Sequence, residues 1–208
     1  METNQGYKNK ALASLEGKWS TAAIVSLIFF AITEGVSMVV TAPMGTDKIM
    51  AYSTQGIWEL LCLPLGWGFT VYFLNLIRNE DISYTRLFDG FKDFLRIFLT
   101  EFLVVLAVLI GCIFLIVPGI ILALMFAQVE FILKDDKEIG AVDAMMKSMK
   151  MMEGHKVELF LLILSFFGWF LLACITFGLG FLLLAPYFSA TMAHYYEDLK
   201  AETADEIF

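Results

Sequence analysis

The sequence has few charged residues for its length. Asp, Glu, Lys and Arg together make up 17% of the 208 residues, whereas a soluble domain usually carries about a quarter. Hydrophobic residues make up 59%. A water-soluble fold of this size has too little interior for so many apolar side chains, so the composition predicts that lipid solvates part of the surface. The net charge of −8 argues against a nucleic-acid partner, which would need a basic surface.

Signatures of enzyme chemistry are also missing from the sequence. The three cysteines, Cys62, Cys112 and Cys174, lie inside apolar segments without a CxxC pair, which is typical of small buried side chains. The two histidines, His155 and His194, do not have the spacing of a zinc site. No GxSxG, P-loop or GxGxxG motif occurs. We therefore predict no catalytic residue, no metal site and no cofactor.

Long apolar segments are what the sequence does contain. A helix needs about 20 apolar residues to cross the hydrocarbon core of a bilayer. Proline and glycine divide the longer runs, since Pro removes a backbone donor and Gly permits a turn. The sequence predicts an all-α, polytopic transmembrane helix bundle, a single integral membrane domain over residues 1–208 with six spans in three hairpins. The predicted spans are residues 19–41, 57–77, 97–117, 119–133, 157–176 and 178–196.

The basic residues are distributed unevenly between the loops of this topology. Thirteen of the 14 Lys and Arg residues fall on one side of the membrane, and Lys48 alone falls on the other. Basic residues stay in the cytoplasm. The pattern therefore predicts a multi-pass membrane protein with both termini cytoplasmic.

Two cytoplasmic loops have the periodicity of amphipathic helices that lie on the membrane surface. In residues 83–96 and 139–156 the apolar residues recur at the i, i+3, i+4, i+7 spacing of one helical face. The second stripe is rich in methionine and predicts a face that packs on lipid or on the bundle, or that binds a partner. Its methionines are Met145, Met146, Met149 and Met152.

Pairs of spans and surface helices suggest an internal repeat of three units. The second span of each hairpin contains a proline toward its outer end, and Gly66-Trp67-Gly68 suggests a place where another helix approaches closely. We expect hinges at the glycines and prolines of these positions. The predicted hinge residues are Pro64, Pro118, Gly119, Gly178, Gly180 and Pro186.

Polar residues inside the spans are the candidates for a functional site, because they are costly in lipid. Among the charged candidates, Glu34 lies deepest, and Glu59 lies near the outer end of its helix. Gln128 is an uncharged polar residue among the apolar side chains in the middle of a span. Three further carboxylates lie near cytoplasmic ends and close in sequence to Arg or Lys, so we expect them to snorkel to the interface or to pair there. They are Glu101, Glu130 and Glu158.

Several short motifs resemble those of a bacterial membrane family catalogued as domain of unknown function 975. They include Val117-Pro118-Gly119-Ile120, Met151-Met152-Glu153-Gly154-His155-Lys156, Thr176-Phe177-Gly178-Leu179-Gly180, Leu15-Glu16-Gly17-Lys18-Trp19 and Phe88-Asp89-Gly90-Phe91-Lys92. The resemblance covers most of the chain, although Phe126 stands where a Tyr is expected. It implies a bacterial integral inner-membrane protein and no particular activity.

Three hypotheses of function remain open at this point. The first is a non-enzymatic protein that scaffolds or regulates a membrane protein partner or a second copy of itself, or that maintains the envelope. The second is a transporter or channel for a small or lipid-like solute, which the repeat, the broken spans and Glu34 suggest. The third, a lipid-modifying enzyme that uses His155 with Asp135 or Asp136, has no support from spacing, and we expect no enzyme.

Overall fold

The described part of the chain is helical throughout. A computed structural model describes residues 2–44 and 47–207, and within those residues it contains no strand. The helices in chain order are α1 (Asn4–Leu15), α2 (Trp19–Phe30), η1 (Ala31–Gly35), α3 (Val36–Thr41), η2 (Ala42–Met44), α4 (Lys48–Leu61), α5 (Leu63–Ile77), η3 (Tyr84–Phe91), α6 (Phe94–Phe114), α7 (Ile116–Met125), α8 (Val129–Asp135), α9 (Ala141–Met151), α10 (Lys156–Leu164), α11 (Phe167–Ile175) and α12 (Phe181–Ile207). The expected all-α class is confirmed.

Four of these helical stretches are long and apolar enough to cross a membrane. They are Trp19–Thr41, Phe94–Phe114, Ile116–Asp135 and Lys156–Ile175. A fifth candidate is the pair α4 and α5, which is bent by 44°. Fewer than half of the residues in the most apolar window of each stretch are buried, and large apolar side chains are common among the exposed ones. An apolar surface of this extent suits lipid and not water.

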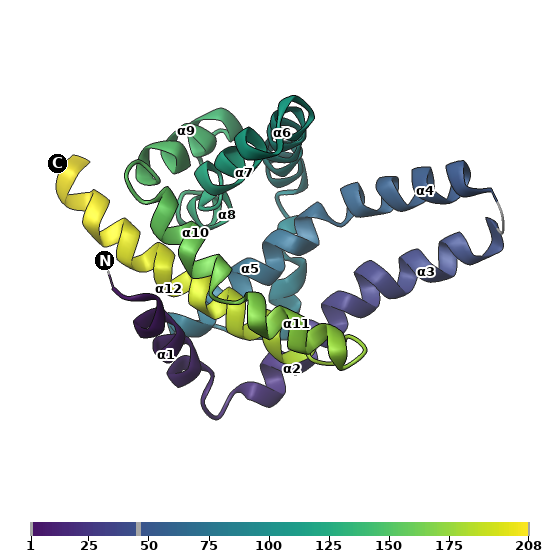
Figure 1. The fold of residues 1–208 in the computed structure, drawn as a ribbon, viewed down its shortest axis with the longest axis horizontal. Helices are drawn as coiled ribbons and strands as arrows, with labels where there is room; N and C mark the ends of the chain where they lie inside the picture. Colours follow the sequence, from purple (N-terminus) through teal and green to yellow (C-terminus); the bar gives the residue numbers. More distant parts are fainter. Residues whose placement is uncertain (1, 45–46, 208) are drawn as a thin grey trace.

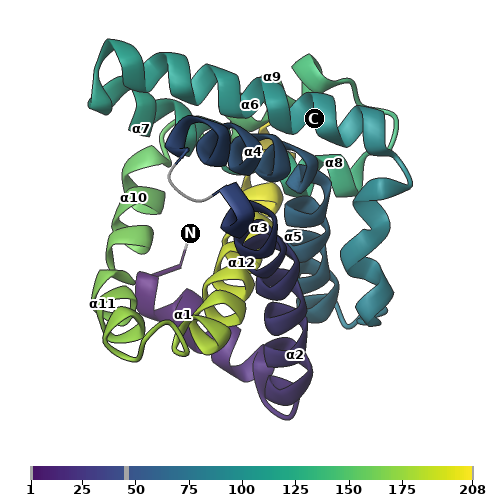
Figure 2. The same cartoon turned by 90° about the vertical axis from the view of Figure 1, so that its right-hand side faces the viewer.

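Helices α5 and α12 form the centre of the protein. α5 contacts α1, α2, α4, α6, α8, η3 and α12, and α12 also contacts α1, α2, α9 and α11. From Pro64 to Leu76 almost every residue of α5 is buried. In Figure 2, α10 and α11 lie on one side of this centre, and the α6–α7 pair runs across the upper edge. A helix that is apolar on all sides is expected inside a bundle, as α5 is.

Two glycines allow η3 to lie directly on α5. A Cβ atom added at Gly68 would lie 2.0 Å from the carbonyl oxygen of Leu87, and one at Gly90 would lie 2.1 Å from that of Pro64. Any larger side chain at either position would push the two helices apart. The close approach expected near Trp67 is therefore confirmed at Gly68, whereas Gly66 has open space around it.

The first two spans leave the body of the protein together. Helix α3 follows α2 through a π-helical turn at Ala31–Gly35, and α4 meets α5 at a bend of 44° beside Cys62. Figure 1 shows α3 and α4 projecting side by side away from the other helices. Helix α4 begins at Lys48, where the side chain of Asp47 accepts a hydrogen bond from the Met50 N–H at 3.1 Å. The loop predicted before residue 57 is therefore largely helical, and residues 45 and 46 of it lie outside the described residues.

The break predicted at Pro118-Gly119 is displaced by three residues. The helix ends at Phe114, and Leu115 has extended backbone angles (φ −165°, ψ 146°). Pro118 lies in the first turn of α7, where a missing N–H costs nothing. Gly119 instead serves packing, since a Cβ there would lie 2.1 Å from the sulfur of Cys112.

The other predicted hinges have different surroundings. Pro64 is in the first turn of α5, directly after the bend, and Pro186 lies inside α12. Gly178 has a φ of +86° in the turn between α11 and α12, which favours glycine. Gly180 packs against Ala173, and its N–H donates to the Thr176 hydroxyl at 2.9 Å.

The predicted surface helices are shorter than the sequence pattern suggested. Residues 83–96 contain a 3-10 helix, η3, followed by the start of α6 at Phe94. Residues 139–156 contain α9, which ends at Met151 before a turn in which Gly154 has a φ of +82°. Side-chain periodicity alone did not show these ends because the apolar stripe continues through both turns.

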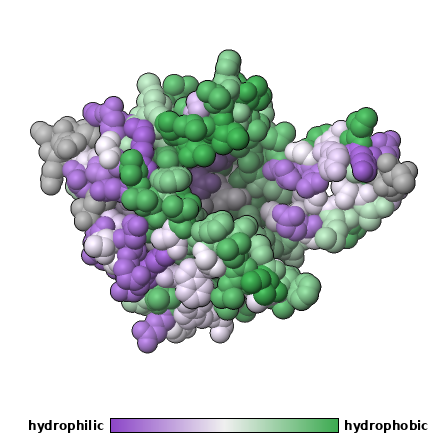
Figure 3. Space-filling model, in the orientation of Figure 1, coloured by the Kyte–Doolittle hydropathy of each residue, from purple (hydrophilic) through white to green (hydrophobic). Residues whose placement is uncertain are grey.

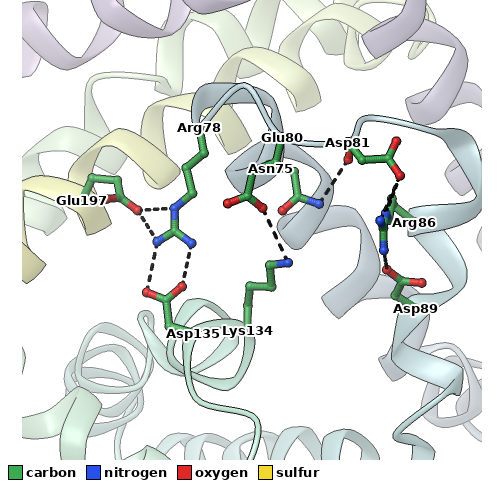
Figure 4. A network of polar contacts seen from close by, with 9 residues as sticks. All are labelled: Asn75, Arg78, Glu80, Asp81, Arg86, Asp89, Lys134, Asp135 and Glu197. Carbon is green, nitrogen blue, oxygen red and sulfur yellow. Dashed lines mark hydrogen bonds and ion pairs between the residues drawn. The ribbon is translucent and has the colours of Figure 1, made fainter.

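Three chain segments meet in an ion-pair network that we name the Arg78 cluster, formed by Arg78, Asp135, Tyr196, Glu197 and Lys200. Figure 4 shows Arg78 between Asp135 and Glu197. Arg78 Nη1 lies 2.6 Å from Asp135 Oδ1, and Arg78 Nε lies 2.8 Å from Glu197 Oε1. The Tyr196 hydroxyl donates to Asp135 Oδ2 at 2.8 Å. The Arg78 and Asp135 side chains are 20% and 16% exposed. The cluster ties the ends of α5 and α8 to α12.

A second, more exposed network lies on η3. Arg86 pairs with Asp81 and with Asp89, both at 2.9 Å, and Lys92 also pairs with Asp89. Burial by itself would raise the pKa of Asp89, but hydrogen bonds from Lys92 and Arg86 outweigh it and leave that pKa below its ordinary value. This network is local to one loop and joins no distant helices.

Removal of the Arg78 side chain should destabilise the fold by about 3 kcal/mol, because it leaves Asp135 partly buried with fewer partners. We expect Arg78→Ala to lower the free energy of unfolding in detergent by this amount, measured by far-UV circular dichroism as dodecyl sulfate is added. Arg86→Ala is the matched control, because Arg86 is more exposed (35%) and Lys92 still pairs with Asp89 after its removal, so we expect a loss of about 1 kcal/mol or less. Equal losses in the two variants would contradict a special role of the Arg78 cluster.

Candidate functional site

Two adjacent cavities between the helices share two glutamates, one buried and one half-buried. One has a volume of about 270 Å³ and the other about 420 Å³, and Glu101 and Glu130 line both. Glu34 and Glu59 also line the smaller cavity. We name these four glutamates and the two cavities the glutamate pocket. Figure 3 shows a hollow beside the base of the projecting α3–α4 arm, with hydrophilic residues in its depth and hydrophobic residues around it.

Glu101 is the most deeply placed carboxylate of the pocket. It lies in the second turn of α6 and is 8% exposed. Its Oε1 atom is buried and has no hydrogen-bond partner among the described residues. A buried carboxylate without a partner is costly in an apolar environment, and a bound proton or cation would relieve that cost.

Glu130 faces the Thr70 hydroxyl of α5 from the start of α8. It is half-buried, and it is near enough to Glu101 for the two carboxylates to repel each other. The backbone holds Glu130 in place, because the indole N–H of Trp67 donates to its carbonyl oxygen at 3.0 Å. The two glutamates therefore meet on a rigid support.

Glu34 and Glu59 are exposed and lie on the helices that form the projecting arm. Glu34 belongs to the π-helical turn, a feature that is frequent at functional sites. The indole N–H of Trp58 donates to the carbonyl oxygen of Thr33 in that turn at 3.0 Å. Gln55 donates to Glu59 Oε1 at 3.0 Å. The Trp58 contact joins α4 to the π-helical turn, whereas the Gln55 contact lies within α4 and fixes the position of the Glu59 side chain.

The pocket carries charge of one sign. Neither cavity has an Arg, Lys or His among its described lining residues. The remaining lining is apolar or weakly polar and includes Phe29, Phe30 and Trp58 in the smaller cavity, and Val104, Val108 and Phe188 in the larger one. Because salt and water screen such a site poorly, its field favours a cation.

Sequence reasoning did not find the two central glutamates. It expected Glu101 and Glu130 to snorkel or to pair near Arg96 and Lys134, and the expected pairing is wrong. Arg96 donates instead to the carbonyl oxygens of Leu133 and Asp136 at 3.3 and 3.1 Å, and Lys134 pairs with Glu80 at 3.8 Å. For Arg96 a signal was available, since five residues along a helix rotate a side chain by about 140°.

The third carboxylate of that group is paired, but not with Lys156. Glu158 lies 3.2 Å from His155 Nδ1. His155 is thereby engaged at the start of α10, whereas Asp135 belongs to the Arg78 cluster. The structure does not bring His155 and Asp135 into a common hydrogen-bond network among the described contacts.

Gln128 lies apart from the glutamate pocket. It is fully buried between α7 and α8, its backbone N–H donates to the Ser148 hydroxyl at 3.2 Å, and its side-chain amide lies 3.6 Å from the sulfur of Met152. Its contacts are with α9. Of the three intramembrane residues singled out from the sequence, the structure joins Glu34 with Glu59 and separates Gln128 from them.

The methionine stripe of α9 mostly faces the bundle. Met152 is fully buried, and Met145 and Met149 pack against the core. Met146 is 54% exposed. One methionine of the stripe is therefore open to a partner or to lipid.

Comparison with models of known protein families identifies the family of the chain. The family model described as "Protein of unknown function (DUF975)" matches residues 1–126 and 104–203. The chain belongs to this family. No curated protein and no solved structure matches the DUF975 chain. Among the described residues of this DUF975 protein, no group of three or more His, Cys, Asp or Glu side chains is arranged to hold a metal ion.

Replacement of the central carboxylate by an apolar group of similar size should stabilise the protein. We expect Glu101→Leu to raise the free energy of unfolding in detergent by about 1–3 kcal/mol, because it removes an unsatisfied buried acceptor. Glu158→Leu is the control, since that side chain is exposed and paired, and no gain is expected there. A loss of stability in Glu101→Leu would show that the Glu101 carboxylate holds the fold together.

Proposed function

We propose that the chain is a six-span protein of the bacterial inner membrane, with three hairpins and both termini in the cytoplasm. The distribution of Lys and Arg supports this topology. The Arg78 cluster supports it as well, because its members come from three segments that the topology assigns to the same side. The sixth span would be the apolar first half of α12, from Phe181 onward.

Cysteine labelling tests this topology. With Cys62, Cys112 and Cys174 replaced by Ala, single cysteines are introduced by Lys48→Cys and Phe177→Cys at outer turns and by Gln5→Cys and Lys137→Cys at cytoplasmic positions. A membrane-impermeant maleimide should label the outer pair in intact cells and the cytoplasmic pair only after permeabilisation. Labelling of Lys137→Cys in intact cells would overturn the proposed orientation.

For the biochemical role, we propose that the protein binds, and moves across or within the bilayer, a small or lipid-like solute. The observation that supports this proposal is the glutamate pocket, in which the buried carboxylate of Glu101, with one oxygen unpartnered among the described residues, lines two cavities of about 270 and 420 Å³. Cavities of this order suit small ligands. Ionisable groups are retained inside a membrane domain at a cost in stability, usually for function.

A scaffold or regulator remains the second candidate. The surface that favours this role consists of Met146 and the exposed apolar side chains around it. Three of the four methionines on which that hypothesis relied pack inward, so only a small exposed surface supports the scaffold hypothesis. In either role we propose a non-enzymatic protein, because His155 and Asp135 are engaged with separate partners.

Filling the smaller cavity tests the solute-binding role. Gly66 lines that cavity, and an added Cβ atom there would meet nothing within 4 Å, so Gly66→Leu fills open space without a clash. We expect wild-type protein purified in mild detergent to retain a lipid or small molecule in native mass spectrometry. Gly66→Leu should retain it at about one-tenth of that occupancy or less.

Gly168→Leu is the matched control for this experiment. Gly168 lies on α11, also has open space around it, and lines neither cavity of the glutamate pocket. It should keep the bound molecule. Equal retention by both variants, or retention of a protein partner with no small molecule, would favour the scaffold hypothesis.

A further inference from the structure

The glutamate pocket contains a carboxylate that has no counter-charge. Glu101 is more than nine-tenths buried, lines both cavities, and has an oxygen without a partner among the described residues. The basic residues that lie near the two central glutamates in the sequence are engaged elsewhere: Arg96, near Glu101, with backbone carbonyl groups and Asp93, and Lys134, near Glu130, with Glu80. The protein therefore supplies negative charge to this cavity and leaves it unneutralised.

The arrangement of charge and apolar surface indicates what would neutralise it. Carboxylates come from four helical elements, η1, α4, α6 and α8, so that negative charge surrounds the smaller cavity. Aromatic rings of Phe29, Phe30 and Trp58 line the same cavity, and aromatic faces attract organic cations. A compact, strongly hydrated metal ion would gain little from those rings, whereas an ammonium group carrying carbon substituents contacts both rings and carboxylates.

The larger cavity provides room for the rest of such a molecule. It begins at the same two glutamates and is otherwise lined mainly by aliphatic and aromatic side chains, among them Val104, Val108 and Phe188. An apolar chain or ring placed there would be removed from water while its charged end stays beside Glu101 and Glu130. A molecule with a cationic head and an apolar body matches both cavities at once.

We propose that the glutamate pocket binds amphiphilic organic cations, with the ammonium group between Glu101 and Glu130 and the apolar part in the larger cavity. This inference rests on the proposed solute-binding function and specifies its substrate class. Glu34 and Glu59, which are exposed at the arm, attract the cation before it reaches the two central glutamates. The cation has two sources, either a free amine or quaternary ammonium compound or a lipid with a cationic headgroup.

Direct binding in dodecyl maltoside micelles, which contain no ammonium group, tests the charge requirement. The probes are benzyltrimethylammonium, phenylmethanesulfonate as the matched anion, and benzyl alcohol as the neutral compound, titrated calorimetrically with empty micelles as the blank. We expect wild-type protein to bind the cation at least about tenfold more tightly than either of the other two. Glu101→Gln and Glu130→Gln should each weaken cation binding about tenfold or more.

Two further variants keep the result interpretable. Glu158→Gln removes an exposed carboxylate outside the pocket and should bind as wild type does. Gly66→Leu should abolish binding of the cation by filling the cavity. Folding of each variant is checked by size exclusion and circular dichroism, and Glu130→Gln tests the proposal if Glu101→Gln does not fold.

The source of the cation is distinguished in a second arm. Nanodiscs containing one part in ten of a diacyl lipid with a trimethylammonium headgroup are exchanged into detergent for native mass spectrometry. Retention of that lipid by wild type but not by Glu101→Gln indicates a lipid substrate, and calorimetric binding of benzyltrimethylammonium without lipid retention indicates a free one.

The outcomes distinguish a failure of the cation preference from a failure of the proposed solute-binding function. If Gly66→Leu loses a bound neutral or zwitterionic molecule and Glu101→Gln keeps it, solute binding stands and the preference for cations is overturned. If neither variant changes what the protein retains, both the pocket and the proposed function are overturned.

Discussion

Helix α5 runs through the protein with almost no residue exposed between Pro64 and Leu76, and it contacts α1, α2, α4, α6, α8, η3 and α12. η3 lies on it because Gly68 and Gly90 have no side chains to keep the backbones apart. α8 is attached through the Trp67 indole, and α12 through Arg78 at the end of the helix. An apolar helix without a polar face has no stable place except the interior of a bundle, and this constraint orders the rest of the fold.

The charged residues of the protein are separated into two environments. In the Arg78 cluster and on η3, each carboxylate meets an Arg or Lys within hydrogen-bonding distance, and such pairs hold loop ends together. In the glutamate pocket the carboxylates have no cationic neighbour in the described lining. A protein selected for stability alone would place an apolar residue at Glu101, so its presence indicates that this carboxylate serves another purpose.

The shape of the pocket follows from irregularities in the first two spans. The π-helical turn at Ala31–Gly35 and the bend beside Cys62 direct α3 and α4 away from α5 together (Figure 1). Side chains that two straight helices would bury against each other, such as Glu34 and Glu59, instead face an opening. Trp58 bridges the two irregularities by donating to Thr33, so that the opening is a fixed feature of the backbone.

The sequence by itself determined the helical class, the apolar segments and the family, because hydropathy and helical periodicity are properties of short stretches of chain. It located the turn at Gly178, but it placed the break near Pro118 three residues too late, since a proline is tolerated in the first turn of a helix as well as between helices. It placed Glu101 beside Arg96, although the two point to different sides of α6. Tertiary structure alone decided that Arg96 turns to backbone carbonyls, that Gly68 meets Leu87, and that four glutamates from distant segments surround one cavity. These are contacts between residues far apart in the chain, and no local pattern records which face of one helix will meet which face of another.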